Sequence, residues 1–237
     1  MSMNTQPGSA IVLGVGPGLG LALCKVFASK GLKVAAGSRG GAQCAVGISG
    51  VTPYTVDAAD SESVQKLVDA VERDIGPIRV AVFNAAPRPK RVSVLDLQPQ
   101  DFEQSWRIGC LGGLQLGQAV ASRMCARGES GTLLFTGATA SLRGGSMLAD
   151  FASAKCGLRA VAQSMARELS PRGIHVAHVI VDGLIQGEIA EKLAGPASAP
   201  DSRMDPDELA LCYWQIHEQG RSAWTHELDL RPYCEKF

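Results

Sequence analysis

The first residues that could do chemistry are glycines spaced for binding a phosphate group. Residues 14–20 read G-V-G-P-G-L-G, after the apolar run 10–13 and before a segment of helical period. Glycine permits a tight turn and lets backbone amides approach a phosphate at the start of a helix. The spacing alone is a weak signal, but this context favours dinucleotide binding over a structural turn. We predict that the pyrophosphate is bound by Gly14, Gly16, Gly18, Leu19 and Gly20.

The residues that end the second apolar run indicate which dinucleotide binds. A protein that binds NAD usually carries an acid there, which bonds the ribose hydroxyls. This chain has Ser38 and Arg39 instead and no acid. A guanidinium matches a 2′-phosphate in charge and geometry. We therefore expect NADP(H) rather than NAD, which stays possible; a solvated loop arginine is the alternative reading.

Composition excludes several other classes of function. The 23 basic and 23 acidic residues balance, so no field favours nucleic acid or an anionic membrane. The seven cysteines are scattered without a C-x-x-C pair, which argues against a disulfide framework or a zinc site. His175 and His178 lie three apart on a predicted strand and face opposite sides, so no metal is expected. The polar first residues and the short apolar run after them predict a cytoplasmic protein without a signal peptide or membrane span.

Short apolar runs alternate with segments of helical period along the whole chain. Most runs lack polar alternation, as parallel strands covered on both faces do. This pattern predicts an α/β fold: a single-domain Rossmann fold over residues 1–237 with a doubly wound parallel seven-stranded sheet in the order 3-2-1-4-5-6-7. The predicted strands are 10–13, 34–36, 52–56, 80–83, 133–135, 176–181 and, less clearly, 225–230. Helices should begin after the caps Asp60 and Asp205, and the glycine-rich stretch 37–50 should be a loop.

At this point the chain resembles the short-chain dehydrogenase/reductase family. The glycine loop is similar to T-G-x-x-x-G-x-G, with Leu13 in place of the threonine. Asp57, followed by Ala58, stands where the family has the aspartate that meets adenine. The segment 151–155, F-A-S-A-K, stands where the family has Y-x-x-x-K. The family's N-A-G after strand four is matched by Asn84, Ala85 and Ala86.

The resemblance implies a catalytic tetrad of Asn, Ser, Tyr and Lys. In the family the tyrosine exchanges a proton with the substrate, and the lysine lowers the tyrosine pKa and holds the nicotinamide ribose. Here Lys155 is present, but Phe151 stands at the tyrosine position, Ala138 at the serine position and Gly109 at the asparagine position. The tyrosine of related enoyl reductases would fall on Leu148. Substitute hydroxyls to consider are Thr139, Ser141 and Tyr213.

Two functions remain open from the sequence. The first is an NADP(H)-dependent oxidoreductase of unknown small-molecule substrate, with displaced or substrate-supplied proton transfer. The second is a non-catalytic NADP(H)-binding scaffold or redox sensor. The resemblance implies a homodimer or homotetramer. The basic run 88–91 after strand four is either a solvated loop or a mouth that attracts anionic substrates.

Overall fold

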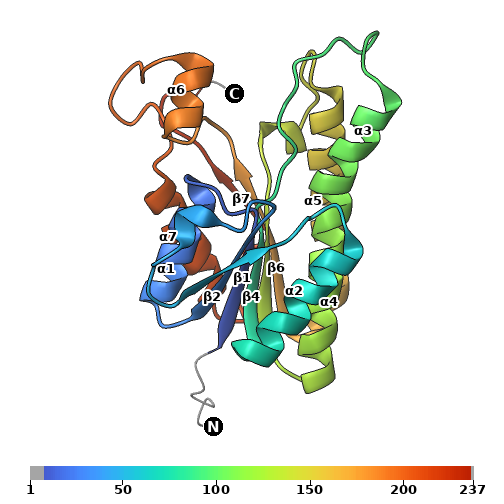
Figure 1. The fold of residues 1–237 in the computed structure, drawn as a ribbon, viewed down its shortest axis with the longest axis vertical. Coiled ribbons are helices and arrows are strands. Elements are labelled where there is room, and N and C mark those ends of the chain that lie inside the picture. Colours follow the sequence, from blue (N-terminus) through green and yellow to red (C-terminus); the bar gives the residue numbers. More distant parts are fainter. Residues whose placement is uncertain (1–7, 236–237) are drawn as a thin grey trace.

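A seven-stranded, all-parallel sheet forms the centre of the computed structural model, which describes residues 8–235 (Figure 1). The strand order is β3-β2-β1-β4-β5-β6-β7, so the predicted doubly wound Rossmann fold is confirmed. Residues 1–7, on which the expectation about a signal peptide partly rests, lie outside the described residues. The strands are β1 (Ser9–Leu13), β2 (Lys33–Ser38), β3 (Val51–Thr55), β4 (Ile78–Phe83), β5 (Gly131–Thr136), β6 (Ile174–Val181) and β7 (Glu227–Leu230).

Helices cover both faces of the sheet. The helices α1 and α7 pack together on one face, and α2, α4 and α5 cover the other (Figure 1). A π-helical segment, Arg107–Leu111, joins α3 to α4. Within residues 8–235, no helix combines the length and apolar character needed to cross a membrane. The helices are α1 (Leu19–Ser29), α2 (Ser61–Asp74), α3 (Pro99–Trp106), α4 (Gly112–Arg127), α5 (Ala149–Leu169), α6 (Glu188–Ala194) and α7 (Pro206–His217).

Local signals account for where several elements begin. The carboxylates of Asp60 and Asp205 accept hydrogen bonds from the first-turn amides of α2 and α7, as predicted for N-caps. The glycine-rich stretch after β2 forms a loop with one short 3-10 turn, Gln43–Ala45. The last strand begins two residues later than the predicted 225–230: the Thr225 amide bonds to the Gln219 side chain rather than to β6, whereas the His226 carbonyl already accepts from the His178 amide of β6.

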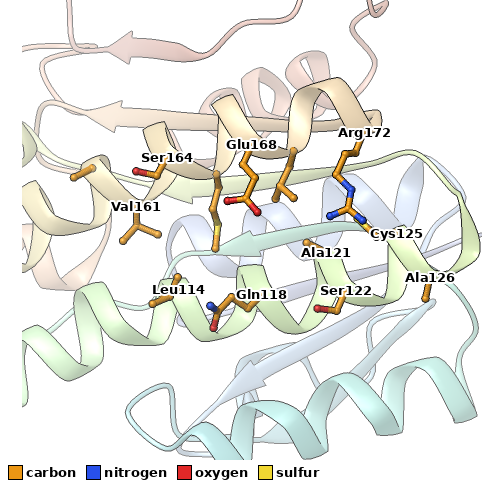
Figure 2. Close-up of a pocket in the computed structure, with 13 residues that line it drawn as sticks. Leu114, Gln118, Ala121, Ser122, Cys125, Ala126, Val161, Ser164, Glu168 and Arg172 are labelled. Atoms are coloured by element: carbon orange, nitrogen blue, oxygen red, sulfur yellow. The ribbon is translucent and has the colours of Figure 1, made fainter.

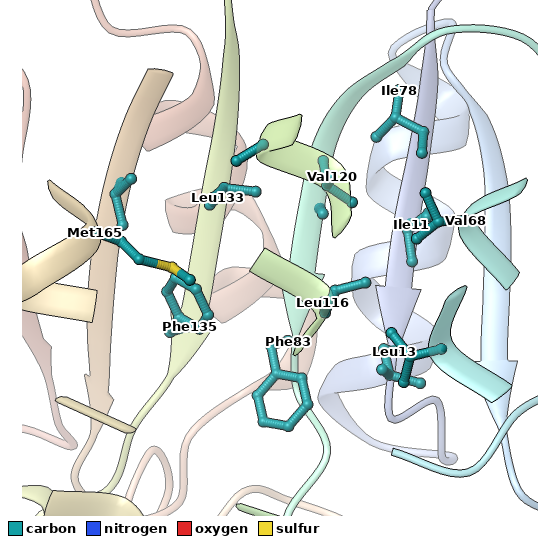
Figure 3. Packing of buried hydrophobic residues seen from close by; sticks show 14 of the residues in the cluster. Ile11, Leu13, Val68, Ile78, Phe83, Leu116, Val120, Leu133, Phe135 and Met165 are labelled. Carbon is teal, nitrogen blue, oxygen red and sulfur yellow. The ribbon is translucent and has the colours of Figure 1, made fainter. Parts of the chain in front are cut away.

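The sheet is buried because each face has its own hydrophobic core. Every residue of β1 and β6 is buried. Figure 3 shows the core under α2, α4 and α5, where Phe83, Leu116 and Phe135 interdigitate. Side chains on the other face pack against α1 and α7. Both cores fix the strands in register, so the loops that follow their carboxyl ends are held in place at one edge of the sheet.

Candidate functional site

Two glycines of the 14–20 loop are required by close backbone packing. Gly14 has a φ of +105°, and a Cβ there would lie 2.3 Å from the Ala85 amide nitrogen. A Cβ on Gly20 would lie 2.7 Å from the Gly14 carbonyl oxygen. The Asn84 side-chain amide donates to that same oxygen at 2.8 Å. The loop after β1 and the loop after β4 are therefore locked together.

The other two glycines of the loop face open space. A Cβ on Gly16 would meet no atom within 4 Å, and one on Gly18 would meet only the Ile185 side chain, at 3.8 Å. The helix α1 begins at Leu19, and the first amides of a helix have no acceptor within the helix. Room for a close approach together with unbonded amides fits a pyrophosphate group.

The loops after β2 and β3 hold the other predicted nucleotide contacts. The Ser38 hydroxyl accepts from the Ala42 amide at 2.7 Å and keeps its own proton to donate. Arg39 is exposed and makes no ion pair with another residue of the range 8–235. Asp57 accepts from the Ala59 amide at 2.9 Å. The carbonyl of buried Ala58 lies against the start of α4, where a Cβ on Gly112 would approach it to 2.4 Å. The guanidinium of Arg39 is thus free to bind a 2′-phosphate, as the sequence predicts.

Lys155 is buried where the carboxyl end of β5 meets α5. Its ammonium donates to the Thr136 carbonyl at 2.8 Å. Burial lowers the pKa of Lys155 to about 8. The Phe151 ring, one helical turn earlier, has its centroid 6.0 Å from the Lys155 nitrogen. The ring gives this ammonium an apolar neighbour that has no ionisable group.

The two positions where the sequence predicts the family's asparagine and serine, Gly109 and Ala138, differ in the space around them. A Cβ on Gly109 would lie 2.9 Å from the Ala154 Cβ and 3.0 Å from the Pro87 Cδ, so an asparagine there requires the backbone to move. Ala138 already carries a Cβ and is partly exposed, so a hydroxyl adds one atom. The side chains of Ala154 and Pro87 therefore crowd Gly109, whereas Ala138 already accommodates a Cβ.

The nearby hydroxyl groups are engaged elsewhere. Thr139 donates to Asp182, and the carboxylate of Asp182 also lies 3.3 Å from Arg231. The Ser141 hydroxyl accepts from the Ala138 amide at 3.1 Å and is buried. The Tyr213 hydroxyl bonds to the Thr136 side chain at 2.9 Å, and burial raises the pKa of Tyr213. The structure therefore does not present any of the three considered hydroxyls to Lys155.

Sequence reasoning missed a polar cluster behind the site. Buried His178 has its Nδ1 3.0 Å from Glu227, which also forms a two-bond ion pair with Arg159 at 2.7 Å. Burial lowers the pKa of His178 to about 4. The His178 ring packs against Gly137 in the turn after β5. These residues come from α5, β6 and β7, and only the strand position of His178 was visible in the sequence.

The chain is similar to known proteins over most of its length. The family model described as short chain dehydrogenase matches residues 9–196. A 3-oxoacyl-[acyl-carrier-protein] reductase, MabA, of Mycobacterium tuberculosis is 31% identical over 78% of this chain and 72% of its own length. A crystal structure of a short-chain dehydrogenase from Rhodopseudomonas palustris is 37% identical, with a TM-score of 0.80 over 96% of this chain and 100% of that one.

A more distant structure agrees in fold alone. It is a metagenomic short-chain oxidoreductase in complex with NADP, 20% identical, with a TM-score of 0.79 over 95% of this chain and 97% of that one. The family match, the relatives and the arrangement of loops around the sheet edge agree. The chain belongs to the short-chain dehydrogenase family.

Proposed function

We propose that the protein is an NADP(H)-binding oxidoreductase of this family in which the Asn-Ser-Tyr-Lys tetrad is degenerate. The observation that carries the proposal is buried Lys155, beside Phe151 rather than a tyrosine. Ala138 and Gly109 complete an atypical set in which only the lysine is kept. The protein thus belongs to a subgroup with Phe at the tyrosine position, and residues 1–237 act as one nucleotide-binding domain.

The residues present fit a nicotinamide dinucleotide. The amides of the glycine loop would hold the pyrophosphate, Arg39 and Ser38 the 2′-phosphate, and Lys155 the nicotinamide ribose. The loops after β3 and β4 would bound the adenosine half through Asp57, Ala58, Asn84, Ala85 and Ala86. When bound, this cofactor supplies or accepts a hydride.

The residues of the reaction centre limit which substrates can react. Reduction of a ketone needs a proton at the carbonyl oxygen, and general acid catalysis contributes about 10²–10⁴-fold. Phe151 has no proton to give, and Ala138 has no hydroxyl to bond the oxygen. A substrate whose acceptor carbon is activated, and which takes its proton from water, does not need these groups. The ketone chemistry in the relative's name, 3-oxoacyl reduction, is therefore not assigned to this chain.

The second candidate function is a non-catalytic NADP(H)-binding scaffold or redox sensor. The observation that favours it is the engagement of Thr139, Ser141 and Tyr213 in other hydrogen bonds. A sensor needs the cofactor site but no proton relay. Both candidates share the prediction of NADP(H) binding, and turnover separates them.

Titration with NADPH and NADH tests the cofactor assignment. NADPH should bind at least tenfold more tightly than NADH, and Arg39→Ala should remove most of that preference by weakening NADPH alone. Lys25→Ala, which removes an exposed cation of α1, serves as the matched control and should change neither affinity. Equal affinities for the two nucleotides, unaffected by Arg39→Ala, would overturn the assignment.

We also propose that a second copy of the chain packs on a groove between α4 and α5. This groove, of about 950 Å³, is lined by buried Ala121 and Leu169, and Figure 2 shows Ala121 on α4 facing the space between the two helices. Glu168 and Arg172 also line the groove and make no ion pair with the described residues. A two-fold contact would let each charge meet its opposite on the partner.

Light scattering after size-exclusion chromatography tests this assembly. The double variant Ser122→Arg and Ser164→Arg places a cation on both walls of the groove and should shift the mass toward the monomer. Ser29→Arg, at the exposed end of α1, is the control and should leave the mass unchanged. A natural protein that is monomeric at micromolar concentration would contradict the proposal.

A further inference from the structure

We propose that Glu227, His178 and Ser141 position the turn after β5, and through it the groups that face the cofactor. The inference rests on the proposed function only for the roles of Lys155 and Ala138. We call the three residues the polar triad. They come from β7, from β6 and from the turn itself, so the triad extends from the last strand of the sheet to the reaction centre.

The turn after β5, residues 136–141, carries two predicted parts of the reaction centre. Its first residue, Thr136, accepts the hydrogen bond of the Lys155 ammonium at 2.8 Å. Ala138, at the family's serine position, donates from its amide to the Ser141 hydroxyl at 3.1 Å and accepts from the Ser141 amide at 2.8 Å. A displacement of this turn therefore moves Ala138 and the acceptor of Lys155 together.

His178 lies directly behind the turn. It is fully buried, and a Cβ on Gly137 would lie 2.4 Å from its Nε2. The same Cβ would lie 2.9 Å from the Ser141 hydroxyl oxygen. The Lys155 ammonium is also near enough to lower the pKa of His178. The two polar atoms therefore border one point, which is free because residue 137 has no side chain.

The Glu227 carboxylate determines which ring nitrogen of His178 carries the proton. Arg159 forms two hydrogen bonds of 2.7 Å with this carboxylate and lowers its pKa, so Glu227 is ionised and only accepts. It lies 3.0 Å from Nδ1 of His178. Burial lowers the pKa of His178 to about 4 and keeps the ring neutral, so Nδ1 holds the single proton and Nε2 has an unshared pair.

The Nε2 of His178 needs a donor, and Ser141 has one. Within residues 8–235, buried Nε2 has no hydrogen-bond partner. The Ser141 hydroxyl accepts from the Ala138 amide and keeps its own proton. A buried acceptor without a donor is unfavourable, so a small shift of the turn that joins the two groups is stabilising. The distance between them depends on the position of the turn, and hence on what Lys155 binds.

A serine, a histidine and a carboxylate also occur together in hydrolases, where the serine attacks the substrate. Ser141 is only 2% exposed, so no substrate reaches its hydroxyl. Its oxygen is also held by the Ala138 amide. The triad therefore acts on the backbone of the turn and not on a substrate.

The ¹⁵N NMR spectrum of histidine-labelled protein tests the triad directly. The His178 signals, assigned with His178→Leu, should show a proton on Nδ1 and none on Nε2 at neutral pH. Saturating NADPH should shift the Nε2 signal toward that of a hydrogen-bonded nitrogen, and Ser141→Ala should abolish this shift. A proton on Nε2, no shift on NADPH binding, or a shift that persists in Ser141→Ala would overturn the inference.

The affinity for NADPH shows whether the triad positions the turn. Ser141→Ala and His178→Leu should each weaken NADPH about fivefold, because the acceptor of Lys155 is no longer held in place. The matched control is His175→Leu: His175 is buried on the other face of β6 and stacks on Trp224 at 4.8 Å. This variant should lose stability but change the affinity less than about twofold.

The outcomes also separate this inference from the proposed function. Equal NADPH affinity in the natural protein, Ser141→Ala and His178→Leu would overturn the inference and leave the proposed function standing. If His175→Leu weakens NADPH as much as His178→Leu does, the effect is one of stability and the inference fails. If the natural protein does not bind NADPH, the proposed function fails, and the position of the proton on His178 alone decides whether the triad exists.

Discussion

The cofactor loop and the reaction centre lie at the same edge of the sheet but differ in what they keep. In the loop, Gly14 and Gly20 sit where any side chain would collide with backbone, and Asn84 fastens them to the next strand. In the reaction centre, Lys155 is buried with an apolar neighbour, and the side chains of Ala154 and Pro87 crowd Gly109. The cofactor loop and Asn84 follow β1 and β4, whereas Lys155 lies where β5 meets α5. Substitutions in the reaction centre can therefore leave the geometry of the cofactor loop unchanged.

The largest expected effect comes from substituting Gly14. Gly14→Ala combines a φ of +105° with a Cβ 2.3 Å from the Ala85 amide nitrogen, so the free energy of unfolding should fall by about 3 kcal/mol or more. Chemical denaturation measures it. Gly16→Ala is the matched control: it should change stability by less than about 1 kcal/mol yet weaken NADPH, because its methyl fills the approach to the loop. Similar losses of stability in both variants would show that the loop is not divided in this way.

Lys155→Met should stabilise the protein without cofactor and weaken its binding of NADPH. Because the folded-state pKa of Lys155 is about 8, below its ordinary 10.5, the unfolded chain binds the additional proton between these values. Stability should therefore rise from pH 8 to 10.5, and burying the charge at pH 7 costs on the order of 3 kcal/mol. The methionine variant should lack that rise and unfold at a higher denaturant concentration. A less stable variant with unchanged NADPH affinity would make the lysine a structural residue.

The free energy of unfolding should fall in acid because buried His178 must then take up a proton. Its folded-state pKa of about 4 lies below the ordinary 6.5, so its contribution is complete above pH 6.5 and is lost as the pH falls toward 4. The loss should reach about 2 kcal/mol or somewhat more. His178→Leu leaves the Glu227–Arg159 ion pair in place. In this variant the slope of unfolding free energy against pH, between pH 4 and 6.5, should fall by the equivalent of about one proton. An unchanged pH dependence of unfolding would show that His178 titrates normally.

The strands were predictable because buried parallel strands are continuous apolar runs, and their order was predictable from the alternation of strands with helices that is typical of a doubly wound sheet. The caps Asp60 and Asp205 were predictable because an N-cap bonds to amides within its own first turn. The final strand was placed two residues too early. Its residues are only half-buried, and the bond between the Thr225 amide and Gln219 depends on a loop conformation.

The site was predictable only where its contacts are local. The spacing of Phe151 and Lys155 on one helix face could be read directly. The hydrogen bonds between Thr139 and Asp182 and between Tyr213 and Thr136 join residues that are far apart in the chain. Crowding of Gly109 by Pro87 and a distant helix is likewise invisible in sequence. Such contacts appear only once the strands are assembled.

Restoring the tyrosine and serine would show whether the protein keeps its cofactor site but lacks the family's proton relay, as we propose. We would compare the natural protein, Phe151→Tyr, and Phe151→Tyr with Ala138→Ser, using NADPH and a broad panel of ketones. Gly109 is left alone because an asparagine does not fit there. We expect all three proteins to bind NADPH and only the two variants to show measurable turnover. Turnover of a ketone by the natural protein at ordinary rates, about 1–10³ per second, would contradict it.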